Sequence, residues 1–83
     1  MQMFDYEAPA ELFPSRRYAK SSQGLYRRFG AASEAIRHLM EDLPGVALAG
    51  SILEVEEHRY DGAAIRRLYE ADTYPLPRRA RAA

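Results

Sequence analysis

One apolar stripe constrains the fold of this chain more than any other feature of its sequence. The stripe has the spacing of one helix face and consists of Ala32, Ile36, Leu39, Met40 and Leu43. Polar side chains occupy the opposite side, and Pro44 with Gly45 marks the end of the pattern. We therefore predict a helix over residues 31–43, and its single apolar face requires another element to cover it.

A second, shorter helix is predicted over residues 62–71. Asp61 is a good N-cap residue because its carboxylate can accept hydrogen bonds from the first free backbone N–H groups. This helix also has one apolar stripe, which consists of Ala64, Ile65, Leu68 and Tyr69. Two such helices cannot bury themselves, so the cover must come from strands.

Three segments have the residue types of strands. Ala10–Phe13 is apolar but stopped by Pro14, which predicts an edge strand at best. Residues 25–29 alternate, with Tyr26 and Arg28 on one face. Residues 52–60 are interpreted as one continuous strand whose even-numbered side chains point outward.

These elements predict a single small α+β domain in the order β-β-α-β-α. Both helices should pack on one face of a three-stranded sheet and leave the other face open. Residues 1–9 are assigned to an N-terminal arm, residues 10–74 to the domain and residues 75–83 to a Pro/Arg-rich tail. The expected core is Leu25, Phe29, Ile36, Leu39, Met40, Leu43, Leu53, Val55, Ile65, Leu68 and Tyr69.

Composition excludes several classes of protein. Twelve Lys and Arg balance 12 Asp and Glu, so net charge provides no long-range attraction to nucleic acid or to an anionic membrane. The chain has no cysteine, which excludes disulfides and thiolate zinc sites. No apolar run approaches the roughly 20 residues of a membrane helix, and the acidic start is unlike a secretory signal. We expect a cytoplasmic protein.

Catalytic and metal-binding patterns are weak. Glu54, Glu56 and His58 alternate along one predicted strand face, but a solvated face paired with Arg28 explains them better than a metal site. The serines lie in no nucleophile elbow, and no glycine-rich phosphate loop is present. We therefore expect a protein without enzymatic activity, metal or cofactor.

The predicted open sheet face is the leading candidate for function. It combines tyrosines with charges of both signs, and the expected interface residues are Tyr26, Arg28, Glu54, Glu56, His58 and Tyr60. Such a face could bind a second copy of the chain or another protein. A monomer with a polar open face is the equally open alternative.

A rival function is weak binding of RNA or single-stranded nucleic acid. Residues 15–28 contain basic and aromatic side chains but no acid, and the candidate contacts are Arg16, Arg17, Tyr18, Lys20 and Arg27. The zero net charge and the lack of a known nucleic-acid-binding motif oppose this function. We therefore rank nucleic acid below a protein partner.

Three stretches of the chain, YRRFGAASEAIR (26–37), ILEV (52–55) and DGAAIRRLY (61–69), resemble short proteobacterial proteins of unknown function. The similarity extends over most of residues 12–79 and lies in the overall pattern. It implies a stand-alone bacterial domain, assigns no activity, and transfers no functional residue to this sequence.

Overall fold

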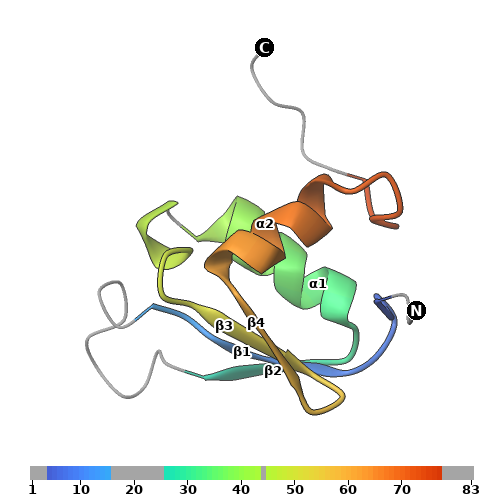
Figure 1. Cartoon of the computed structure of the whole chain (residues 1–83), viewed down its shortest axis with the longest axis horizontal. Helices are drawn as coiled ribbons and strands as arrows, with labels where there is room; N and C mark the ends of the chain where they lie inside the picture. Colours follow the sequence, from blue (N-terminus) through green and yellow to red (C-terminus); the bar gives the residue numbers. More distant parts are fainter. Residues whose placement is uncertain (1–3, 16–25, 44, 78–83) are drawn as a thin grey trace.

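Four antiparallel strands and two α-helices make up the described part of the chain, residues 4–15, 26–43 and 45–77 of a computed structural model (Figure 1). Their bounds are β1 Ala10–Phe13, β2 Arg27–Phe29, α1 Ala32–Arg37, β3 Ile52–Val55, β4 His58–Asp61 and α2 Gly62–Glu70. A π-helical turn, His38–Asp42, continues α1, and a 3₁₀ turn, Gly45–Ala47, precedes β3. The fold is α+β, as predicted, with one strand more than expected.

Strand β1 lies in the centre of the sheet, whose order is β2-β1-β3-β4. The prediction that this segment is an edge strand was wrong. Pro14 follows the last strand residue, so its missing N–H removes no hydrogen bond from the ladder. Ala10 and Leu12 are both buried on the helix-covered face, which fits a central position better than an edge.

The predicted continuous strand over 52–60 is instead a hairpin. Strands β3 and β4 are joined by Glu56 and Glu57, both in the left-handed region with φ of 51° and 70°. Positive φ at both central residues is the geometry of a two-residue type I′ turn, normally marked by Asn-Gly or Asp-Gly. Two glutamates carry no such signal, and the fourth strand was therefore missed.

Both helices cover the same face of the sheet (Figure 1). The predicted helices are confirmed, and the Asp61 carboxylate caps α2 by accepting a hydrogen bond from the N–H of Ala64 at 2.9 Å. Six predicted core residues are buried, namely Ile36, Leu39, Leu53, Val55, Ile65 and Tyr69. Phe29, Met40, Leu43 and Leu68 are half-buried against them, and Leu25 lies outside the described residues.

The N-terminal arm and Tyr74, at the end of the predicted domain, pack against the start of α1. Backbone oxygens of Tyr6 and Ala8 accept hydrogen bonds from the N–H groups of Ser33 and Ala32 at 2.8 and 2.7 Å, which satisfies the first turn of α1. The Tyr74 hydroxyl donates to the carbonyl of Ser33 at 3.0 Å. The Tyr6 and Tyr74 rings meet with centroids 5.8 Å apart, so the two ends of the described chain lie together beside the helices.

We predict that Gly62→Ala destabilises the domain by about 1–3 kcal/mol, the range typical of overpacking. A Cβ atom at this position would lie 2.4 Å from the carbonyl oxygen of Leu48, where backbone has to move. Gly30→Ala is the matched control, because a Cβ there has no neighbour within 4 Å. Urea unfolding of both variants is the measurement, and equal losses of stability would contradict the close contact at Gly62.

We predict that Glu57→Gly stabilises the domain by about 1 kcal/mol, because it relieves the left-handed strain of a residue with a Cβ at φ 70°. Glu57→Gln removes the same charge and keeps the Cβ, so it should leave the strain in place. Thermal and urea unfolding of the pair separate backbone from charge. A stabilisation by glutamine equal to that by glycine would show that charge, not backbone geometry, is responsible.

Candidate interaction surface

A row of four charged residues crosses the open face of the sheet, which no helix among the described residues covers (Figure 1). The strand register places Glu11 opposite Arg28 on one side and opposite Glu54 on the other, and Glu54 opposite Arg59. Across β2, β1, β3 and β4 the charges therefore run plus, minus, minus, plus. Both arginines are exposed and both glutamates are half-buried.

A second row, apolar over most of its length, lies next to the charged one. Phe13 is opposite Ile52, and Ile52 is opposite Asp61. Tyr26, just before β2, extends this row because its ring centroid is 5.3 Å from that of Phe13. Tyr26 is 50% exposed, more than any other large hydrophobic side chain among the described residues.

The charges at the centre of the face are only partly compensated. Glu11 and Glu54 are like charges directly opposite each other, an arrangement that destabilises a sheet. In the described part of the chain, neither Arg28 nor Arg59 forms an ion pair with these glutamates, for which a nitrogen would have to lie within 4.0 Å of a carboxylate oxygen. The Tyr26 hydroxyl donates a hydrogen bond to Glu11 Oε2 at 2.7 Å, and this bond, with the nearby negative charge, raises the pKa of the Tyr26 phenol.

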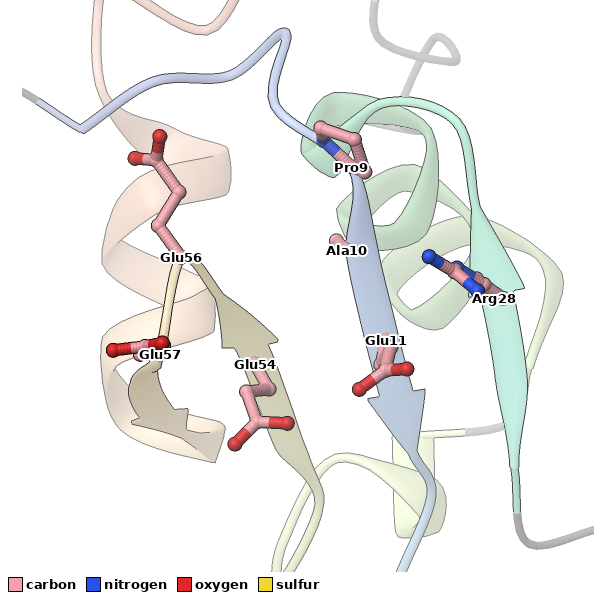
Figure 2. A pocket seen from close by; sticks show the side chains of 7 residues that line it. All are labelled: Pro9, Ala10, Glu11, Arg28, Glu54, Glu56 and Glu57. Carbon is pink, nitrogen blue, oxygen red and sulfur yellow. The ribbon is translucent and has the colours of Figure 1, made fainter.

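A shallow hollow of about 350 Å³ lies where the charged row meets the β3–β4 turn (Figure 2). It is lined by Pro9, Ala10, Glu11, Arg28, Glu54, Glu56 and Glu57. Four carboxylates and one guanidinium give it an acidic character. The described residues nevertheless contain no group of three His, Cys, Asp or Glu side chains arranged to hold a metal ion.

A second hollow, of about 380 Å³, lies at the N-terminus of α2 and is lined in part by Gly50, Asp61 and Arg66. Helix N-termini can bind anions through free backbone N–H groups. Here the Asp61 carboxylate already accepts a hydrogen bond from one of those groups and brings a negative charge to this end of the helix. The hollow is therefore poorly suited to a phosphate.

The structure brings together half of the interface residues expected from the sequence. Tyr26, Arg28 and Glu54 share the open face, and Glu56 lies in the turn at its rim. His58 and Tyr60 do not join them.

The two-residue turn explains this difference. It pairs Val55 with His58 and Leu53 with Tyr60, so both partners take the helix-covered side of the sheet, where Tyr60 is half-buried and His58 is exposed. The Tyr60 ring packs edge-on against Phe4 with centroids 5.1 Å apart. In a continuous strand the even-numbered residues would all have pointed outward, as expected, but the turn reverses the alternation.

Five members of the face were absent from the expected interface, namely Glu11, Phe13, Ile52, Arg59 and Asp61. The first two were missed because their strand was assigned to an edge. Arg59 was missed because the hairpin was not recognised. Buried and outward-facing side chains alternate visibly along the sequences of β1 and β3. With β1 placed in the centre of the sheet, this alternation would have identified the residues of the two strands that share the open face.

The residues expected to contact nucleic acid do not form one surface among the described residues. Arg16, Arg17, Tyr18 and Lys20 lie outside the described residues. Arg27 is opposite Leu12 and therefore on the helix-covered side, where its guanidinium carbon lies 5.0 Å from the centroid of the Phe29 ring. Arg27 and Arg28 thus point to opposite faces of the sheet.

Comparison of the chain with protein-family models, curated proteins and solved structures finds no match in any of the three. The likeness to proteobacterial proteins therefore stays a prediction. No helix in the part of the chain that the structure describes has the length and apolar character needed to cross a membrane.

We predict that Glu11→Gln lowers the raised pKa of Tyr26 towards the ordinary phenol value of about 10, because the accepting carboxylate is lost. Since the folded-state pKa is raised, the bond contributes fully to stability below the ordinary pKa and is lost as pH rises through the raised value. An NMR pH titration, assigned with Tyr26→Phe, is the measurement.

Glu54→Gln is the matched control for this titration. Its charge acts on Tyr26 from a distance, without a hydrogen bond to the phenol, so the pKa of Tyr26 should change less than in Glu11→Gln. Equal changes in the two variants would mean that general electrostatics, not the Tyr26–Glu11 bond, set the pKa.

Proposed function

We propose that this chain is a non-enzymatic interaction module that binds a protein through the open face of its sheet. The observation that carries the proposal is the combination of two rows on a face that no helix among the described residues covers. Phe13, Ile52 and Tyr26 supply apolar and aromatic contact area, and the adjoining glutamates and arginines supply polar groups that can fix the partner's orientation. Interfaces commonly combine aromatic and arginine anchors in this way.

The charge distribution supports a protein partner over nucleic acid. Glu11 and Glu54 occupy the middle of the face, where they would repel phosphates. The two flanking arginines lie on opposite edge strands with both carboxylates between them, so they do not form a continuous basic stripe. A partner with patches of both signs suits this face better than a uniformly anionic strand.

Site-specific photo-crosslinking in the source cells tests the proposal. A benzophenone side chain replaces Tyr26, which is exposed on the open face, and in a matched variant it replaces Arg67, which is exposed on α2. We expect discrete protein adducts from position 26 and none from position 67. Absence of adducts at position 26, or the same adducts from both positions, would contradict the proposal.

A titration with a generic single-stranded oligonucleotide at low and high salt tests the alternative. We expect no binding even at low salt. Binding that weakens with salt, at a slope near 0.7 per phosphate contact, would instead favour the RNA or single-strand function.

A further inference from the structure

We infer that the partner of the open face is a second copy of this chain, paired over β1 and β2 about a two-fold axis parallel to the strands. This inference rests on the proposed function and specifies its partner. The contact is assigned to this half of the sheet because only there do both the charged row and the apolar row complement themselves.

The charge row determines where the axis can lie. An axis over the middle of the sheet, between β1 and β3, would place Glu11 over Glu54 of the second copy and Arg28 over Arg59. Both pairs are like charges, which oppose association. An axis between β2 and β1 instead places Arg28 of each copy over Glu11 of the other. Two opposite-charge pairs form, one on each side of the axis.

The apolar row is consistent with the same axis. A two-fold parallel to the strands keeps each row at its own level along the strand, so the second row faces the second row. Tyr26 of each copy then lies over Phe13 of the other, so the exposed Tyr26 ring covers the half-buried Phe13 ring. Face-to-face sheets pack about 10 Å apart, a distance that such side chains can span.

The other half of the sheet lacks this match. An axis between β3 and β4 would place Glu54 over Arg59, which is favourable, but it would also place Ile52 over Asp61. Asp61 is already engaged as the N-cap of α2, and an aliphatic side chain over its carboxylate would remove water without providing a partner. The β1–β2 half is therefore the preferred contact.

The contact is small, since two short strands per copy provide much less than the roughly 800 Å² that each partner buries in a standard interface. The dimer should therefore be weak, and it should weaken further with salt because its charge pairs are exposed. These expectations define the conditions of the test, namely high protein concentration and low ionic strength.

Light scattering and sedimentation equilibrium of the purified chain provide the test, with charge reversal as the probe. The wild-type chain should exceed its monomer mass of 9.4 kDa as concentration rises at low salt. Arg28→Glu should weaken dimerisation at least tenfold. Combining it with Glu11→Arg should restore dimerisation to within a few-fold of the wild type, because each new carboxylate then lies over a new guanidinium. Circular dichroism and thermal melting verify that each variant folds.

Arg67→Glu is the control, because it makes the same change at an exposed arginine on α2, away from the open face, and should leave dimerisation unchanged. A wild-type monomer at the highest concentration, failure of the double reversal in a folded variant, or equal loss in Arg67→Glu would each overturn the inference. The photo-crosslinking experiment separates the two proposals. The purified chain could be a monomer while the crosslinked adducts at position 26 have a mass other than twice that of the chain. That result would leave the proposed function standing and would exclude a second copy as the partner.

Discussion

The whole fold depends on strand β1 pairing along both of its edges. This four-residue strand is joined to β2 on one side and to β3 on the other, and Leu12 at its centre has no exposed surface. Because β1 precedes both partners in the sequence, the sheet is completed only when residues about 15 and 40 positions further along return to it. The helices then need only cover the face that this pairing creates.

The helices and most of the core could be predicted from the sequence because their signals are local. The stripe through Ile36 and Leu39 and the N-cap at Asp61 lie within one helical segment each, and the structure confirms them. Strand order is not local. Pro14 indicated an edge, whereas the pairing that places β1 in the centre depends on partners distant in the chain.

The candidate face was only half predictable for the same physical reason. Which face a strand residue takes depends on register, and register past residue 55 depends on a turn whose glutamates lack the usual residue signature. Tyr26, Arg28 and Glu54 were placed together by alternation within their own strands. Tyr60 was misplaced because residues 52–60 were interpreted as one strand in which even-numbered side chains point outward. After the turn, the even-numbered side chains point to the helix-covered face instead.

The Glu56–Glu57 turn therefore imposes a constraint on how this sequence can change over time. Its composition has little effect on the sheet, since any residue pair that tolerates the left-handed region would join the same strands. The length of the turn, in contrast, has a large effect on the sheet. One inserted or deleted residue would turn Arg59 towards the core and His58 towards the open face, unless a bulge absorbed the change. Descendants of this chain should accumulate substitutions here among residues that tolerate the left-handed region, while insertions and deletions are removed by selection.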